Sequence, residues 1–278
     1  MIYVDFSYLI ISCYFAQEKE IGEVTENDFR KHILHALFSI NSRHKHEFGK
    51  MVLCCEGRNS WRYKTFPHYK ILRKVSRAED ALKWKEIDRL TRTIKSEIVE
   101  HNVFCMLGVE GAEGDDVIAV LCETYKEPTL IISEDKDFHQ LHRLSHVKQY
   151  SKRRDAIYKS ADPLHDLKEK IIRGDRNDSI PNIHSKDDVF VIKERQTVVS
   201  AKAFEKYSKT FLICDDGIPE AYRSNFQRNQ TLIDFRFIPS HIRDAILNEM
   251  QKPSSASILS GGKRTQYLLK SGLNPNSF

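Results

Sequence analysis

The residues best suited to chemistry in this sequence are acidic, and most of them follow apolar runs or open predicted helices. They are Glu113, Asp115 and Asp116 in E-G-D-D, Asp135 and Asp137 in S-E-D-K-D-F, and Asp5, Glu56, Asp175 and Asp178 elsewhere. Because the carboxyl ends of parallel strands meet at one edge of a sheet, we expect these side chains to converge there. Gathered carboxylates repel one another and raise each other's pKa, and divalent cations remove that cost. The pattern therefore predicts a divalent-metal site.

The segment 58–78 differs from the rest of the chain, because residues 58–77 carry seven basic side chains and no acidic one. The basic residues are Arg58, Arg62, Lys64, Lys70, Arg73, Lys74 and Arg77, interleaved with Trp61, Tyr63, Phe66 and Tyr69. Basic groups contact phosphates and aromatic faces stack on bases, so the mixture favours binding of a single strand or a frayed end. The alternative is a solvated loop with some core aromatics. Together with the carboxylates, the segment indicates a magnesium-dependent nuclease.

Composition narrows the class of protein. The 278 residues are 40% hydrophobic and 30% charged, with a net charge of +5, which suits one domain or one large and one small domain. No signal peptide precedes the first strand, and no apolar run approaches the roughly 20 residues of a membrane helix. We expect a cytoplasmic monomer without a membrane anchor. Its cysteines form no C-x-x-C pair and are expected to be reduced: Cys13, Cys54, Cys55, Cys105, Cys122 and Cys214.

The elements that must position these side chains alternate along the first half of the chain. Apolar runs are separated by amphipathic helices, and the runs lie at residues 1–6, 50–55, 103–107 and 129–133. This alternation predicts an α/β fold with a central, mostly parallel sheet and helices on both faces. Residues 148–150 and 157–158 are predicted to form a hairpin or edge strands.

The second half of the chain has a looser pattern. We expect helices at 198–207, 219–228 and 239–250, an extended stretch at 231–237, and a tail that is ordered around residues 267–269. The predicted organisation is a nuclease domain at 1–185, which includes a basic arch at 58–78. A smaller, mainly helical C-terminal domain at 186–278 follows it.

Five motifs in this order resemble the 5′-nuclease (flap endonuclease) superfamily, and above all its ribonuclease H members from large tailed bacteriophages. They are V-D-F, P-H-Y-K-I-L-R, E-G-D-D, S-E-D-K-D-F and G-D-R-N-D-S-I-P. The last three correspond to the family's E-A-(D/E)-D, S-x-D-x-D and G-D-x-x-D-x-(I/V)-P. Each motif alone is a weak signal, because carboxylates are common, whereas five in order are a strong one. The later L-I-D-F-R-F-I-P-S-H-I also resembles the phage members, so the likeness covers most of the chain.

Three departures from the family pattern stand out. Glu56 occupies a position where the family usually has Asp, and its longer side chain could reach a metal directly or through water. Gly114 replaces a small Ala. After Asp178 the family usually has a G-x-G helix-hairpin-helix turn that binds duplex backbone, often with a potassium ion. Here the chain reads N-I-H-S-K-D-D-V-F, so we expect duplex contacts from another arrangement that uses Lys186, Lys193 and Arg195.

The resemblance implies roles for the individual residues. One metal ion would be served by Asp5, Glu56, Glu113, Asp115 and Asp135, and a second by Asp137, Asp175 and Asp178. Two Mg²⁺ ions are expected, and Mn²⁺ is expected to substitute for them. Asp116 would support these ligands without binding a metal ion itself, or it would only cap a helix. The implied catalytic residues are Lys70, Arg77 and Asp135, with Lys70 at the scissile phosphate and Asp135 near both ions.

The resemblance also implies a substrate and a setting. The basic segment would form an arch over the site through which a 5′ single strand passes, with nucleic-acid contacts from Arg58, Arg62, Lys64, Tyr69, Lys70, Arg73, Lys74 and Arg77. Tyr69 would stack on a base. The expected activity is 5′-to-3′ exonuclease and flap endonuclease cleavage of RNA:DNA and DNA duplexes, and the expected role is RNA-primer removal in phage DNA replication in the host cytoplasm. A single-stranded DNA-binding protein would dock on the C-terminal region.

Three other interpretations fit parts of the pattern. A PIN-like nuclease acting on RNA alone would share the sheet and most carboxylates, but it needs neither the basic arch nor the G-D-x-x-D loop. A phosphatase with a nucleophilic Asp would use a D-x-D motif, which occurs here only at Asp135 and Asp137, after the fourth strand. A non-catalytic, structure-specific DNA-binding protein that has kept the fold would explain Glu56 and the altered loop. It would not explain why the other acidic residues remain together.

Overall fold

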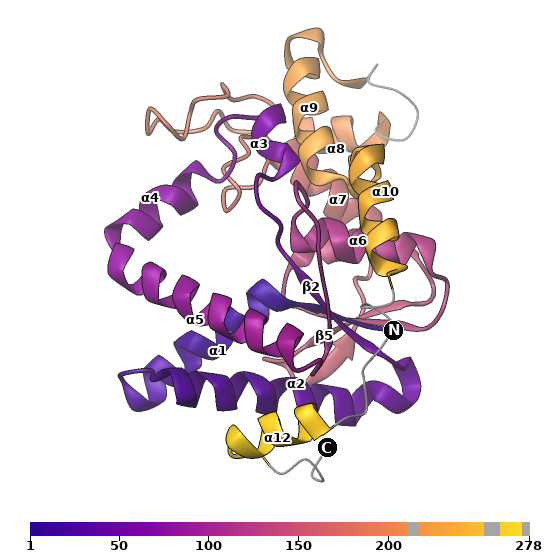
Figure 1. Cartoon of the computed structure of the whole chain (residues 1–278). Helices are drawn as coiled ribbons and strands as arrows, with labels where there is room; N and C mark the ends of the chain where they lie inside the picture. Colours follow the sequence, from indigo (N-terminus) through magenta and orange to yellow (C-terminus); the bar gives the residue numbers. More distant parts are fainter. Residues whose placement is uncertain (211–216, 253–261, 274–278) are drawn as a thin grey trace.

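The computed structural model describes residues 1–210, 217–252 and 262–273 of the chain drawn in Figure 1. Its centre is a six-stranded sheet in the order β3-β2-β1-β4-β5-β6. The strands are β1 (Ile2–Asp5), β2 (Met51–Cys55), β3 (Cys105–Gly108), β4 (Thr129–Ile132), β5 (Val147–Ser151) and β6 (Ala156–Tyr158). Strands β1 to β5 pair in parallel, and β6 runs antiparallel to β5. The predicted α/β fold, its four main strands and the β5–β6 hairpin are therefore confirmed.

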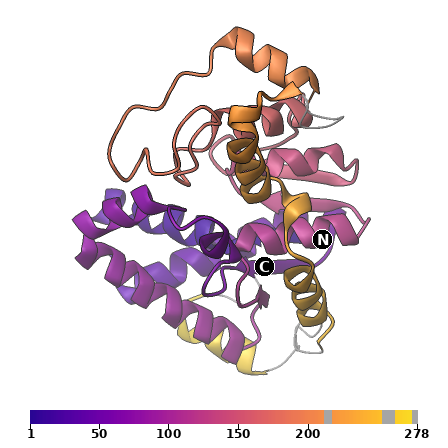
Figure 2. The same ribbon diagram turned by 90° about the horizontal axis from the view of Figure 1, so that it is seen from above.

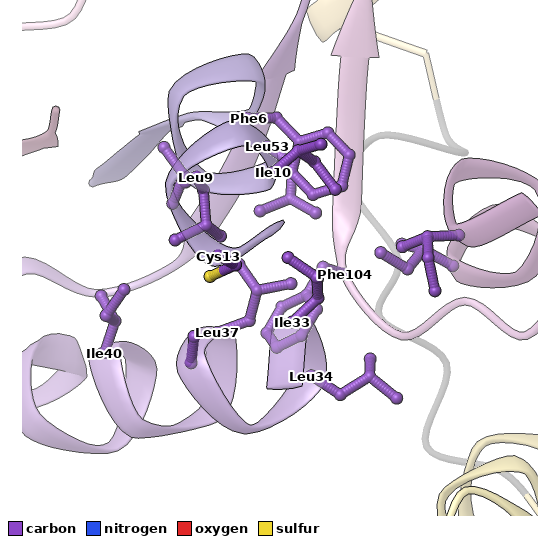
Figure 3. Packing of buried hydrophobic residues seen from close by; sticks show 14 of the residues in the cluster. Phe6, Leu9, Ile10, Cys13, Ile33, Leu34, Leu37, Ile40, Leu53 and Phe104 are labelled. Carbon is purple, nitrogen blue, oxygen red and sulfur yellow. The ribbon is translucent and has the colours of Figure 1, made fainter. Parts of the chain in front are cut away.

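One face of the sheet is covered by α1 (Phe6–Ile21), α2 (Glu26–Phe48) and α5 (Ala81–Glu100). Successive strand side chains point to opposite faces, so Val4 of β1 packs in this layer and Tyr3 packs in the other. Figure 3 shows Leu9 and Cys13 of α1 close to Leu37 of α2 in the same layer. This packing fixes the point where β1 ends and α1 begins, which is the position of the first predicted metal ligand.

The opposite face is covered by α6 (Gly114–Thr124), the 3-10 helices η1 (Lys136–Arg143) and η3 (Phe235–Phe237), and α10 (Ser240–Met250). Val117 of α6, Phe138 of η1 and Ile242 of α10 belong to one buried cluster there. Helices thus lie on both faces, as predicted. Figures 1 and 2 both place α10 on the opposite side of the molecule from α4 (Ile71–Glu79), which precedes α5 in the basic segment.

A third cluster joins the two halves of the chain. It brings Phe66 and Tyr69 of the basic segment together with α7 (Pro163–Arg173), α8 (Ala201–Thr210) and α9 (Glu220–Ile233). The short helix α3 (Trp61–Thr65) also packs near α9. The expected domain boundary at residue 185 therefore falls within a shared hydrophobic cluster, and the C-terminal helices directly support the basic segment.

The expectation of an extended stretch at 231–237 is wrong. Residues up to Ile233 complete α9, and the side chain of Asp234 then accepts a hydrogen bond from the Arg236 backbone N–H, which closes the η3 turn. Phe235 is buried there, so an apolar run that reads as a strand is instead a helix end and a buried turn. The ordered tail is confirmed by α12 (Gly262–Lys270), whose Tyr267 packs on the α1–α2 layer.

The remaining expectations concern cysteines and membranes. The five cysteines within the described residues are free thiols, and Cys214 lies outside the described residues. None of the helices in the described ranges combines the length and the apolar character that crossing a membrane requires.

Candidate metal centre

The carboxyl edge of the sheet gathers acidic side chains into one cavity of about 380 Å³. Asp5 ends β1, Glu56 follows β2, Asp115 lies in the first turn of α6 and Asp135 follows β4. All four line the cavity together with Asp178, which comes from the loop after α7. Because these strands are parallel neighbours, residues that are 130 positions apart in the sequence (Asp5 and Asp135) meet at one edge.

Burial and the neighbouring carboxylates raise the pKa values of Asp5 and Asp115. The Ser133 hydroxyl and the Tyr8 backbone N–H each donate to Asp5 at 2.9 Å. Burial, together with the charges of Asp135 and Glu56, nevertheless raises the pKa of Asp5 to about 6. Burial and the neighbouring aspartates likewise raise the pKa of Asp115 well above its ordinary value. Such a set of carboxylate oxygens suits a hard divalent cation, which would stabilise the ionised forms.

Glu113 is held differently from its neighbours. It is buried, with its Oε2 atom 2.9 Å from the Lys70 Nζ and 2.9 Å from the Tyr69 hydroxyl. Burial opposes ionisation, but the charges of Lys70 and Arg62 prevail and lower the pKa of Glu113 to about 2. Glu113 is therefore a carboxylate that already has a cation beside it, and that cation is the lysine expected to contact phosphate.

A second acidic group lies beside the first. Asp137, Asp175 and Asp178 each offer an oxygen within 4.8 Å of the others, a spacing that could hold one metal ion. Lys170 of α7 lies among them, with its Nζ 2.7 Å from Asp175 and also paired with Asp137. Lys170 is not among the residues that the sequence motifs predict for the site. Its place one helical turn before the loop that carries Asp175 was the signal that could have found it.

The loop after α7 owes its shape to backbone contacts. Gly174 has a positive φ of 73°, and a Cβ atom there would lie 2.3 Å from the Ile180 carbonyl oxygen, so a side chain does not fit. Asp175 and Ile180 exchange two backbone hydrogen bonds of 2.8 Å. This tight loop turns both Asp175 and Asp178 toward the sheet edge.

The chemistry of the donors in the two acidic groups fits two divalent cations, one at each group.

The basic segment lies against these acids. Lys70 has a left-handed backbone conformation, and its backbone N–H donates to the Asp178 carbonyl at 2.8 Å. Arg73 pairs with the Asp178 carboxylate at 2.8 Å. Lys70, Arg73 and Arg77 all line the acidic cavity, whereas Arg58, Lys64 and Lys74 are exposed. The segment from Ile71 to Glu79 is the helix α4, which begins directly after Lys70 and carries Arg77 near its end.

The expectation that Arg62 contacts nucleic acid is wrong, because its side chain is only 4% exposed. Its guanidinium donates to both carboxylate oxygens of Asp116, at 2.8 and 3.0 Å, and its Nε donates to the Leu232 carbonyl at 2.9 Å. Asp116 also accepts from the Trp61 indole N–H and from the Glu113 backbone N–H. Arg62 and Asp116 thus form a buried brace between the basic segment, α6 and α9.

The expectation that Tyr69 stacks on a base is also wrong in this structure. Tyr69 is 2% exposed and belongs to the third hydrophobic cluster. Its hydroxyl lies 2.9 Å from Glu113 and 3.0 Å from Asp178, so it connects the two acidic groups. Basic and aromatic residue types indicated a polyanion-binding segment, but they could not show which members of that segment are buried.

Two families match the chain. The family described as 5′-3′ exonuclease, N-terminal resolvase-like domain matches residues 1–171, and the one described as T4 RNase H, C terminal matches residues 161–275. Ribonuclease H of enterobacteria phage T4 is 26% identical over 287 residues, which cover 98% of this chain and 92% of that protein.

Solved structures from phage T5 have a similar fold. The T5 5′-exonuclease with bound zinc has a TM-score of 0.61 at 15% identity, over 91% of this chain and 99% of that one. A T5 flap endonuclease variant in complex with DNA and metal ions has a TM-score of 0.58 at 15% identity, over 98% of both chains. The long N-terminal family match, which includes the acidic residues up to Asp137, decides the assignment. The chain belongs to the 5′-3′ exonuclease (flap endonuclease) superfamily.

Proposed function

We propose that this protein is a divalent-metal-dependent 5′-to-3′ nuclease, with both exonuclease and flap endonuclease action on RNA:DNA and DNA duplexes that have 5′ ends or flaps. The observation that carries the proposal is the shared edge of the sheet. There Asp5, Asp115 and Asp135 line the same cavity as Lys70 and Arg77, so ligands for a cation and donors for a phosphate face one space. A phosphodiester bound in that space would meet both kinds of group.

The acidic residues divide into two sets. Asp5, Glu56, Glu113, Asp115 and Asp135 would hold one Mg²⁺ ion, and Asp137, Asp175 and Asp178 the other, with Mn²⁺ as a substitute. When bound, such a pair of ions activates a water molecule and stabilises the leaving oxygen of a phosphodiester. Glu56 is exposed but lines the cavity, which supports its inclusion among these ligands. Asp135 lies at the start of η1, next to Asp137, and so adjoins both sets.

The basic residues would bind and orient the substrate. Lys70 is held beside Glu113 and near Asp178, and a phosphate in the cavity would compete for its ammonium group. Arg73 and Arg77 would contact flanking phosphates, because a guanidinium can donate two parallel hydrogen bonds to one phosphate. The buried pair of Arg62 and Asp116 would keep the first turn of α6, and with it Asp115, in position.

A second cavity provides a path for a single strand. It has a volume of about 740 Å³ and shares Tyr8, Arg73, Arg77 and Trp84 with the acidic cavity. Its lining also includes Arg176 and Asn177 from the loop after α7, so α4 and α5 face that loop across it. Cations and aromatic faces along one passage favour an unpaired strand. A 5′ single strand would enter here before its duplex junction reaches the carboxylates.

The biological setting is proposed from the relatives. A protein similar to a phage ribonuclease H would remove RNA primers during phage DNA replication, in the cytoplasm of the host. Duplex contacts would come from Lys186, Lys193 and Arg195, which are exposed after the metal-binding loop. A single-stranded DNA-binding protein would dock on the C-terminal region, and the nuclease would act as a monomer.

Cleavage of 5′-labelled substrates tests the proposal. One substrate carries a 5′ DNA flap and the other a 5′ RNA primer annealed to DNA, each incubated with Mg²⁺ or with a chelator. We expect short 5′ products that require Mg²⁺ and disappear in Asp135→Asn, while that variant still binds the flap. Product lengths separate exonuclease from flap cutting. Tight binding without cleavage by the wild type would refute catalysis and favour a DNA-binding role.

A further inference from the structure

Arg77 lies where the two cavities meet and lines both of them. Its neighbours in the acidic cavity have anionic partners, since Lys70 pairs with Glu113 and Arg73 pairs with Asp178. Within the described ranges Arg77 has no salt bridge, and its Nε atom is buried without a hydrogen-bond partner. A buried guanidinium donor without a partner raises the free energy of the folded protein unless another contact stabilises the group or an anion binds to it.

The contact that stabilises Arg77 is aromatic. Its guanidinium carbon lies over the Trp84 ring, 4.1 Å from the ring centroid, which is within the range of an attractive cation–π interaction. A guanidinium that rests on a ring is held by its face, so this contact does not use the N–H donors along its edge. Those donors are the groups that would bind a phosphate.

Trp84 is itself well fixed. Phe15 of α1 contacts the indole edge-on with ring centroids 6.2 Å apart, and Trp84 packs against the hydrophobic layer of α1 and α2. The start of α5 is tied down by Lys83, which pairs with Glu18 at 3.0 Å and with Asp80 at 3.4 Å. The indole is thus anchored to the core while its ring supports a residue of α4.

We infer that Trp84 is a positioning residue that holds the Arg77 guanidinium ready to bind a phosphate of the substrate strand at the junction of the two cavities. The inference rests on the proposed function, because that function supplies the phosphate. Trp84 acts through Arg77, so removing the indole should not slow cleavage further once the guanidinium is absent. This dependence distinguishes positioning from a general structural role.

A double-mutant cycle on single-turnover flap cleavage tests this dependence. We expect Trp84→Leu to slow cleavage roughly 3- to 30-fold, the range that a cation–π contact supports, and Trp84→Phe to retain most of the rate. The double variant Trp84→Leu with Arg77→Ala should cleave at the rate of Arg77→Ala alone. Effects that multiply would overturn the inference, as would a Trp84→Leu enzyme with the wild-type rate.

Binding measured in chelator gives a readout without cleavage. When a protein neutralises one phosphate fewer on a single strand, the slope of log K against log salt falls by roughly 0.7. Arg77→Ala and Trp84→Leu should both lower the slope by that amount, and Trp84→Phe should not. Weaker binding by Trp84→Leu with an unchanged slope would instead assign the indole to base stacking and refute positioning. A wild type that does not cleave would refute the proposed function, whereas these slopes address Trp84 alone.

Discussion

Lys170 places its ammonium group between Asp137 and Asp175, within the acidic group that could hold the second metal ion. The lysine balances carboxylates that would otherwise repel one another. A divalent cation bound there would do the same, so the two compete for the same oxygens.

Replacing this lysine should expose the competition. In chelator, Lys170→Met should unfold at a lower temperature than the wild type, because Asp137 and Asp175 lose their counter-charge. Added Mg²⁺ should stabilise the variant more than the wild type, by up to about 2.7 kcal/mol at a concentration 100 times its Kd. Thermal unfolding with and without Mg²⁺ measures both effects, with Lys206→Met on the exposed surface of α8 as the control. Equal metal responses in the two proteins would contradict the competition.

The buried pair of Arg62 and Asp116 should contribute strongly to the free energy of unfolding. Arg62→Met leaves Asp116 buried and unpaired, which costs about 3–5 kcal/mol of unfolding free energy. The double variant Arg62→Met with Asp116→Leu should recover much of that loss, because no lone charge remains. Urea denaturation measures each value, and Arg58→Met in the exposed turn after β2 is the control. If Arg62→Met lost less than about 1 kcal/mol, the brace would not have the assigned role.

The exposed cations of the arch should govern salt dependence. Lys64→Ala with Lys74→Ala should reduce the slope of log K against log salt for a duplex flap by roughly 0.9 for each phosphate that the variant no longer neutralises. The matched control is Lys50→Ala with Lys126→Ala, which removes the same charge at the opposite edge of the sheet. Binding titrations in chelator at several salt concentrations supply the slopes. The same slope in both double variants would exclude Lys64 and Lys74 from the interface.

His142 should make the fold sensitive to acid. Burial, with His139 and Lys159 nearby, lowers the pKa of His142 to about 4, compared with about 6.5 in an unfolded chain. Between those values the unfolded chain binds a proton that the folded protein excludes. This contribution to stability is therefore complete above about pH 6.5 and declines as the pH falls toward 4.

The variant His142→Asn should remove this pH dependence while keeping an acceptor for the Ser160 backbone N–H, which donates to the His142 ring at 2.8 Å. From pH 7 to pH 4 the wild type should lose roughly 1–3 kcal/mol more unfolding free energy than the variant. Urea denaturation at several pH values measures the difference. Parallel curves for the two proteins would show that His142 titrates normally.

The sequence alone determined the sheet and the set of acidic residues. Apolar runs separated by amphipathic helices predict a parallel sheet, and carboxylates at the ends of those runs must meet at its carboxyl edge. Asp5 and Asp135 illustrate this, because their strands β1 and β4 are neighbours. Order and spacing of the motifs were enough to predict the family.

Only the tertiary structure decided which charged residues face the cavity and which support it. Arg62 and Arg77 are the same residue type in the same basic segment, yet one is buried against Asp116 and the other rests on Trp84 beside two cavities. Local sequence could not separate them, because burial depends on partners such as Leu232 that lie 170 residues away. The pairing of Lys170 with Asp137 also depends on the tertiary structure, because a different element brings Asp137 to it.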